Sequence, residues 1–247
     1  AMKGVDVKQT DLFDQWKQDE RKDVNLEHLL NMSSGLDFDE TYAPGSDATH
    51  MLFTAYSASD VALTSPLALE PSTHFSYSSG TTNILSRWLH ESLGGDVQAT
   101  LNFVQDELFA PLNMAHTYLE PDASGVHVGS SYIYASARDW ARLGQLLINN
   151  GEWNGKQLIT ADWVQRSATP NVSDNEKRYG YQFWLNQGGE ELRWSNLPAD
   201  AYAMQGNRSQ RVMMIPSKNM VIVRIGWTAG QYPMNDNFSQ LINSLGN

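Results

Sequence analysis

The chain has 247 residues, enough for one large domain or two interleaved lobes around a sizeable core. Its 17 basic and 28 acidic residues give a formal net charge of -11, which repels phosphate backbones, so we expect no nucleic-acid partner. The absence of cysteine excludes disulfides, thiolate metal sites and cysteine nucleophiles. No apolar run approaches the roughly 18 residues of a membrane helix, so we expect no membrane span.

Up to about residue 169 the periodicity of the chain is helical. Asn25 is a candidate N-cap for a short helix with leucines on one face, which the turn at 33–35 ends. Ser136 to Asp139 has the spacing of a capping box and opens an amphipathic helix that closes near 150–151. Three further helices, joined by loops with Pro or Gly, are predicted over 47–60, 82–93 and 96–108.

Beyond Pro170 the pattern changes to short strands separated by turns, as in an antiparallel meander. The predicted strands are 181–186, 192–194, 202–205, 211–215 and 220–227. An amphipathic helix over 236–245 is expected to pack on this sheet. The predicted class is α/β of the α+β type: an antiparallel sheet flanked by helices, with an all-α lobe. We expect one domain over 1–247, mainly helical over about 11–169, with strands and a C-terminal helix over about 170–247.

General searches for reactive motifs find no Gly-x-Ser-x-Gly elbow, Gly-x-Gly-x-x-Gly, P-loop or His-Glu-x-x-His. The six histidines lack ligand spacing. We therefore expect no metal and no cofactor.

A family resemblance begins at residues 26–36, Leu-Glu-His-Leu-Leu-Asn-Met-Ser-Ser-Gly-Leu. They resemble the Leu-Leu-x-Met-x-Ser-Gly-Leu signature of the class C β-lactamase and penicillin-recognising serine hydrolase superfamily. Residues 111–117, 137–144 and 151–156 are similar to further stretches of that family, in the same order. The resemblance favours the esterase and 6-aminohexanoate-dimer-hydrolase branch and implies a β-lactamase/transpeptidase-like fold.

Residues 75–80, Phe-Ser-Tyr-Ser-Ser-Gly, lie where that family carries Tyr-x-Asn or Tyr-Ser-Asn. The family's tyrosine sits between a nucleophilic serine and its lysine and transfers protons, so the resemblance implies a catalytic Tyr77. Spacing alone would make Tyr77 a core aromatic. A phenol with a pKa near 10 needs a nearby ammonium and fixed hydrogen bonds for this role. Ser79 replaces the family's asparagine, and the lost amide argues against strong β-lactam recognition.

Two further stretches suggest substrate contacts. Residues 203–216 fall where the family has its Lys-Thr-Gly or His-x-Gly strand, whose edge aligns substrate and supplies an oxyanion-hole N–H. This places Gln205 and Gly206 at the edge, although no cationic residue matches and a plain hairpin strand is the alternative. Residues 37–42 resemble the loop that covers substrate in the esterase branch; Tyr42 is then a substrate-facing phenol or an exposed loop tyrosine without a role.

The family's nucleophile is a serine followed three residues later by lysine, and no serine in this chain has one. Ser173-Asp174-Asn175 spells another penicillin-binding motif but lies far from the family's position for it, so we interpret it as coincidence. The motif order would put Ser-x-x-Lys before Ala1, together with the first strands and the nucleophile helix. We therefore expect an N-terminally truncated chain whose incomplete sheet edge a complementing chain or a swapped N-terminal segment covers.

The sequence thus predicts that the parent protein is a serine hydrolase acting on a small-molecule ester or amide through an acyl-enzyme, and that this stretch alone is inactive. Two alternatives stay open: a true β-lactamase or D-Ala-D-Ala carboxypeptidase, and a non-catalytic binding module on the same fold. The first residues, Ala1 to Gly4, lack the apolar core of a signal peptide. For the compartment, a periplasmic or secreted bacterial location is favoured over a cytoplasmic one.

Overall fold

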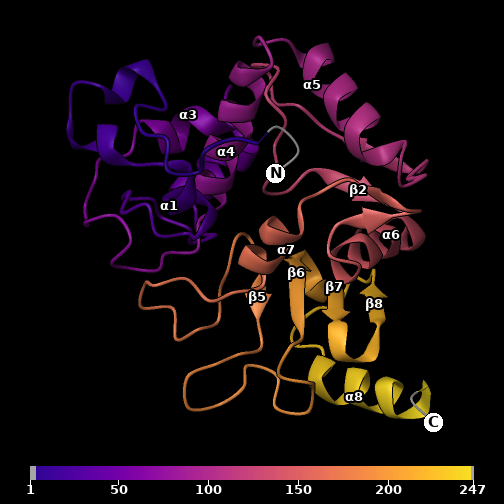
Figure 1. Cartoon of the computed structure of the whole chain (residues 1–247). Coiled ribbons are helices and arrows are strands. Elements are labelled where there is room, and N and C mark those ends of the chain that lie inside the picture. Colours follow the sequence, from indigo (N-terminus) through magenta and orange to yellow (C-terminus); the bar gives the residue numbers. More distant parts are fainter. Residues whose placement is uncertain (1–3, 246–247) are drawn as a thin grey trace.

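The computed structural model describes residues 4–245, so Ala1, Met2 and Lys3 lie outside the described part. Figure 1 shows the early helices α1, α3 and α4 grouped on one side, and the sheet of β5 to β8 with α8 on the other. The α-helices are α1 (Leu26–Leu30), α2 (Asp47–Phe53), α3 (Ala58–Leu63), α4 (Ser79–Ser92), α5 (Val97–Val104), α6 (Ala137–Ile148), α7 (Ala161–Ser167) and α8 (Met234–Leu245). The predicted mixture of helices and antiparallel strands is confirmed.

Polar caps define where the helices begin. The Asn25 side chain accepts a hydrogen bond from the N–H of His28 at the start of α1, and Ser136 accepts from the N–H of Asp139 at the start of α6, as predicted. The prediction of a single helix over 47–60 is wrong. The first helix, α2, ends at Phe53, and Ser57 caps a second helix, α3. In the helix predicted over 96–108, the α-helical part, α5, ends at Val104. The chain then continues as a π-helical turn over Gln105–Phe109.

The main sheet is antiparallel in the order β5-β6-β7-β8, which keeps the strands in chain order. Its strands are β5 (Trp184–Leu185), β6 (Tyr202–Gly206), β7 (Gln210–Ile215) and β8 (Met220–Arg224). Sequence patterning located β6 and β7 closely and the start of β8 correctly, but β8 ends at Arg224, three residues before the predicted end. It overestimated β5, which has only two residues. Two small hairpins, β1–β2 (Thr117–Leu119 and Ile133–Ala135) and β3–β4 (Glu152–Trp153 and Lys156–Gln157), and the helix α7 were not predicted.

The strand predicted over 192–194 does not form. The backbone N–H of Trp194 donates to the side-chain Oδ1 of Asn186, at 2.6 Å, instead of to a neighbouring strand. The amide of Asn186 in turn donates to the backbone carbonyls of Trp194, Leu197 and Pro198. The buried Asn186 therefore holds this segment as a loop. The apolar side chains of the loop, Trp194 and Leu197, are still buried in the core.

Both faces of the sheet are covered by helices. The α8 helix places Phe238 and Ile242 against Met213 and Ile222 of the sheet, and Figure 1 shows it lying across one end of β7 and β8. On the other face, Leu147 of α6 packs in a separate cluster. A third core holds the early helices together around fully buried side chains such as Trp16, whose indole N–H donates to the carbonyl of Leu63 at 2.9 Å. Among residues 4–245, β8 pairs only with β7 and forms one edge of the sheet.

No helix within residues 4–245 combines the length and the apolar character needed to cross a bilayer.

The approach of α6 to the sheet depends on a glycine. A Cβ at Gly144 would lie 2.7 Å from Cγ1 of Val221 and 3.3 Å from Cγ1 of Val212. We predict that Gly144→Val lowers the free energy of unfolding by about 1–3 kcal/mol, because the larger side chain forces the helix off the sheet. Urea denaturation measures the change. Arg138→Ala, on an exposed position of the same helix, is the control, and an equal loss there would contradict the packing explanation.

Candidate functional site

Tyr77 lies just before α4 in a cluster of aromatic rings. Its ring stacks on Trp184 of β5 at a centroid distance of 5.2 Å and an interplanar angle of 30°. It also meets the fully buried Tyr179 edge-on, at 6.1 Å. Tyr77 itself keeps 38% of its surface exposed. The phenol therefore sits where the segment before α4 meets the sheet, held from behind by aromatic packing and open on another side.

A single carboxylate, that of Glu40, joins two of the predicted residues near this position. Glu40 accepts hydrogen bonds from the backbone N–H of Ser79, at 2.7 Å, and from its hydroxyl, at 2.6 Å. The hydroxyl of Tyr42 donates to the same carboxylate at 3.3 Å. Ser79 is the first residue of α4, so the negative charge lies at the positive end of the helix dipole. The structure thus brings the predicted residues Tyr42 and Ser79 together on Glu40, and Ser79 is two residues from Tyr77 in the chain.

The surroundings hold Tyr77 in its neutral form. Burial raises the pKa of Tyr77 above its ordinary value of 10.0, and the charges of Glu40 and Tyr42 add to the shift. The positive charge of Arg211 acts in the opposite direction on the same pKa. Burial also raises the pKa of Tyr42. At neutral pH both phenols carry their protons. The proton of Tyr42 is donated to Glu40, so the phenol of Tyr77 is the one that can donate a hydrogen bond to a ligand.

Gln205 and Gly206 form the end of β6, which turns through Asn207–Ser209 into β7 as a hairpin. Gln205 pairs with Arg211 of β7, and Gly206 pairs with Gln210. Gly206 has extended backbone angles, φ -120° and ψ 168°, so backbone conformation does not require a glycine here. The guanidinium of Arg211 connects this end of the sheet electrostatically to Tyr77. The five residues proposed from sequence therefore fall into two groups. Tyr42, Tyr77 and Ser79 lie around Glu40. Gln205 and Gly206 lie beside Arg211.

The Ser173-Asp174-Asn175 segment contacts the Tyr77 stretch directly, although these contacts do not test whether its match to a penicillin-binding motif is a coincidence. Asp174 accepts a hydrogen bond from the backbone N–H of Phe75 at 2.6 Å and pairs with Nδ1 of His74 at 2.7 Å. The Asn175 side chain accepts from the backbone N–H groups of Arg178 and Tyr179. These contacts hold the loop against residues 74–75. Their role is to position the segment that carries Tyr77.

Sequence reasoning missed several side chains of this region. Glu40 lies inside the 37–42 loop that the family resemblance singled out, so its position was available although its role was not. Trp184 lies in a predicted strand, but no spacing rule shows that its ring reaches Tyr77. Arg193 lies over the Trp184 ring, with its guanidinium carbon 4.1 Å from the ring centroid. Within residues 4–245, no group of three or more histidine or carboxylate side chains is arranged to hold a metal ion.

Comparison with known proteins gives one family and a consistent set of folds. A family model described as Beta-lactamase matches residues 12–239. The structure is similar to a putative 6-aminohexanoate-dimer hydrolase from Bacillus anthracis, with a TM-score of 0.74 and 20% identity over 98% of this chain and 68% of that one. It is also similar to a penicillin-binding protein from Bacillus halodurans, with a TM-score of 0.68 and 18% identity over 98% of this chain and 79% of that one.

A third similar structure is a beta-lactamase/D-alanine carboxypeptidase from Yersinia pestis, with a TM-score of 0.64 and 18% identity over 93% of this chain and 72% of that one. At such identities the likeness to these proteins is a likeness of fold.

Glu40 offers a direct test of the electrostatics at Tyr77. We predict that Glu40→Gln lowers the pKa of Tyr77, because it removes a negative charge that disfavours the phenolate. The same change costs about 1–3 kcal/mol of stability, since one of the two Ser79 hydrogen bonds loses its acceptor. Carbon-13 NMR of labelled tyrosine rings, assigned with Tyr77→Phe, follows the titration. Asp106→Asn makes the same charge change on the exposed turn after α5, and an equal pKa shift there would contradict the local explanation.

The Asp174 contacts predict an acid-dependent stability. Hydrogen bonds from the Phe75 N–H and from His74 lower the pKa of Asp174. A carboxyl with a depressed folded pKa stabilises the fold above its unfolded pKa of about 3.9, and this contribution disappears as the pH falls through the folded value. Asp174→Asn should therefore be less stable than wild type at pH 5, with a difference that narrows toward pH 2.5.

Urea denaturation at each pH measures this difference. Glu107→Gln, on the exposed turn after α5, is the control. A gap between wild type and Asp174→Asn that stays constant with pH would disprove the carboxylate's role.

Proposed function

The chain belongs to the beta-lactamase family, and from that premise we propose that the protein is a serine hydrolase that cleaves small esters or amides through an acyl-enzyme. The observation that carries the proposal is the placement of Tyr77. Its partly exposed phenol is fixed between the Glu40 cluster and Trp184 and lies within electrostatic reach of Arg211, which pairs with Gln205 at the end of β6. This arrangement suits proton transfer beside a strand edge that aligns a substrate.

In the proposed reaction a serine oxygen attacks the substrate carbonyl, and the C–O or C–N bond to the leaving group breaks. The proton of the serine passes through Tyr77 and a lysine to the leaving group, and water then hydrolyses the acyl-enzyme by the reverse transfers. A backbone N–H near Gly206 donates to the oxyanion. Because the pKa of Tyr77 is raised here, the phenol relays a proton in its neutral form unless an ammonium group adjoins it.

The serine and lysine of this scheme are not supplied as Ser-x-x-Lys by these 247 residues. We propose that they come from another segment of the parent protein or from a complementing chain, so this stretch alone is inactive.

The hydrogen bonding of Ser79 supports esters or simple amides over β-lactams as substrates. Its hydroxyl proton is already donated to Glu40, at 2.6 Å, and the residue is buried. It is therefore not free to donate to a substrate carbonyl as an asparagine amide would. A β-lactamase or D-Ala-D-Ala carboxypeptidase would turn over a chromogenic cephalosporin or a stem peptide, whereas a non-catalytic binding module would hydrolyse neither these nor simple esters.

Labelling of the nucleophile tests the proposal. We expect a fluorophosphonate probe to label the complete product of the gene at the serine of a Ser-x-x-Lys sequence and to leave the 247-residue chain unlabelled. In the complete product, Tyr77→Phe should lower kcat for a p-nitrophenyl ester by about 100-fold to 10,000-fold, because the proton relay is lost.

Tyr118→Phe, at an exposed position of β1, is the control and should leave the rate unchanged. Specific labelling of the 247-residue chain, or full activity in Tyr77→Phe, would contradict the proposed function.

A further inference from the structure

Two buried histidines, His90 and His127, lie outside the candidate site, where the last turn of α4 meets α5 and a long loop. Nδ1 of His90 is hydrogen-bonded to the Thr100 hydroxyl of α5, at 3.2 Å. The loop that carries His127 reaches the same helix, because a Cβ built at Gly125 would lie 3.9 Å from Cβ of Val97. The charge of His90 acts on the protonation of His127. Three segments of the chain therefore meet around the two imidazole rings.

Neither ring nitrogen of His127 has its hydrogen bond. Both Nδ1 and Nε2 are buried without a partner among residues 4–245, and the residue keeps only 6% of its surface exposed. A neutral imidazole has one donor and one acceptor, and burying them unpaired costs free energy that contact with water would restore. The closed position of this ring therefore lowers the free energy that is needed to open the loop, even while the ring is neutral.

A proton on His127 would add a larger cost. Burial lowers the pKa of His127 below its ordinary value of 6.5, and the neighbouring charge of His90 lowers it further. The carboxylate of Asp122 acts in the opposite direction on the same pKa. Its oxygens, however, already accept hydrogen bonds from backbone N–H groups of the same loop and of α3. A charged imidazole in the closed loop would thus be poorly compensated.

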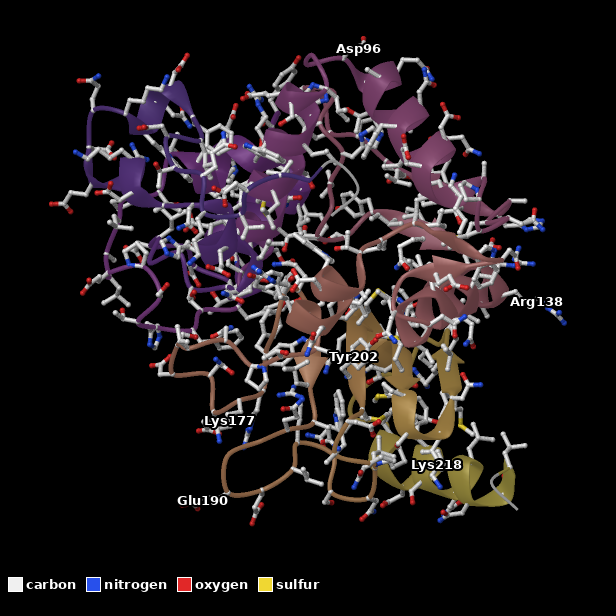
Figure 2. The ribbon with its side chains drawn as sticks, viewed as in Figure 1. Asp96, Arg138, Lys177, Glu190, Tyr202 and Lys218 are labelled. Atoms are coloured by element: carbon white, nitrogen blue, oxygen red, sulfur yellow. The ribbon has the colours of Figure 1, made fainter. Side chains whose placement is uncertain are left out.

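The two helices bring no free counter-charge to this junction. The α5 helix has no ionisable side chain over Val97–Val104. Asp96 precedes α5 as its N-cap and accepts a backbone N–H of the first turn at 2.9 Å. Figure 2 shows Asp96 at the outer margin of the molecule, at the start of α5. Glu91 of α4 is paired with Arg87 at 2.5 Å. Among the described groups, the one carboxylate that acts on His127 is Asp122.

The neighbouring contacts would confine an opening to α5 and the loop over 121–128. Directly after this loop, Gly129 packs tightly on α4, because a Cβ there would lie 2.3 Å from Oγ of Ser86. Ser130 then accepts a hydrogen bond from the Asn83 amide at 3.0 Å. The α5 helix lies at the margin of the fold (Figure 1) and packs mainly on α4. Such peripheral segments open at a free energy below that of global unfolding.

We propose that His90 and His127 form an acid-sensitive latch, which holds α5 and the loop over 121–128 on α4 while His127 is neutral and releases them when His127 takes up a proton. In the open form the ring is hydrated and titrates near 6.5. Because the folded pKa lies below this value, the latch is fully stabilising above about pH 6.5 and weakens as the pH falls toward the folded value. The device belongs to the fold and does not depend on the proposed hydrolase function.

Hydrogen exchange followed by mass spectrometry tests the latch in the 247-residue chain. Protection over 97–104 and 121–128, corrected for the intrinsic exchange rate at each pH, should fall about tenfold from pH 7.0 to pH 5.0, because opening takes up one proton. Protection of β7 should stay the same, since a local opening leaves the sheet intact. His127→Leu should abolish the fall, because leucine fills the space without a titratable group.

Two further variants control for general effects of acid and for folding. His50→Gln removes an exposed histidine of α2 and should keep the pH dependence of the wild type. His127→Gln replaces the ring with a polar side chain that does not titrate, so it retains the test if His127→Leu is not folded. Circular dichroism establishes the folding of each variant, and the wild-type comparison of the two pH values requires no variant.

Unchanged protection of 97–104 and 121–128 between pH 7.0 and pH 5.0 would overturn the inference, as would an equal fall in β7. A pH dependence that survives in a folded His127 variant, or disappears in His50→Gln, would also overturn it. Since no step of the test requires turnover, its failure leaves the hydrolase proposal standing. Conversely, a failed fluorophosphonate experiment would remove the hydrolase proposal without affecting a demonstrated latch.

Discussion

The contact between Glu40 and the first residue of α4 fixes the geometry on which the candidate site depends. The Glu40 carboxylate holds both the N–H and the hydroxyl of Ser79, so the loop that carries it cannot move independently of the helix. The loop is tied in turn to α2 through the N–H of Asp39, which donates to Asp47 at 2.9 Å. Tyr77, two residues before Ser79, inherits its position from this junction. The aromatic contacts with Trp184 then connect the helical core to the sheet.

The same carboxylate sets an electrostatic conflict that gives the site its character. A phenol that moves protons benefits from nearby positive charge, yet Tyr77 experiences Glu40 on one side and Arg211 on the other. Burial adds to the effect of the carboxylate, so the neutral phenol is favoured. Among the described residues Arg211 has no carboxylate partner at ion-pair distance, whereas Arg142 pairs with Asp139. Positional charge, not net charge, therefore decides what the region attracts.

Sequence patterning predicted elements whose signals are local. The Asn25 and Ser136 caps are short-range hydrogen bonds, and the strands β6 to β8 are short, largely apolar runs bounded by turn residues, which located them from the sequence. It failed where distant contacts override local preference. Trp194 belongs to a loop because the amide of Asn186 binds its backbone. The order of scaffold motifs predicted the family, but the partnership of Glu40 with Ser79 and of Asp174 with Phe75 spans 39 and 99 residues, separations at which a single sequence carries no spacing signal.

The brevity of β5 has a consequence for the motions of this region. The strand has two residues, and Trp184 is one of them, so few ladder hydrogen bonds restrain the backbone beneath the Tyr77 ring. The position of the Trp184 ring is maintained chiefly by side-chain packing with Tyr77, Tyr179 and Arg193. Short strands of this kind open locally at a free energy well below that of global unfolding. The backbone amide hydrogens of β5 should therefore exchange with solvent faster than those of β7. A ligand bound beside Trp184 would then be detected as slower hydrogen exchange in β5.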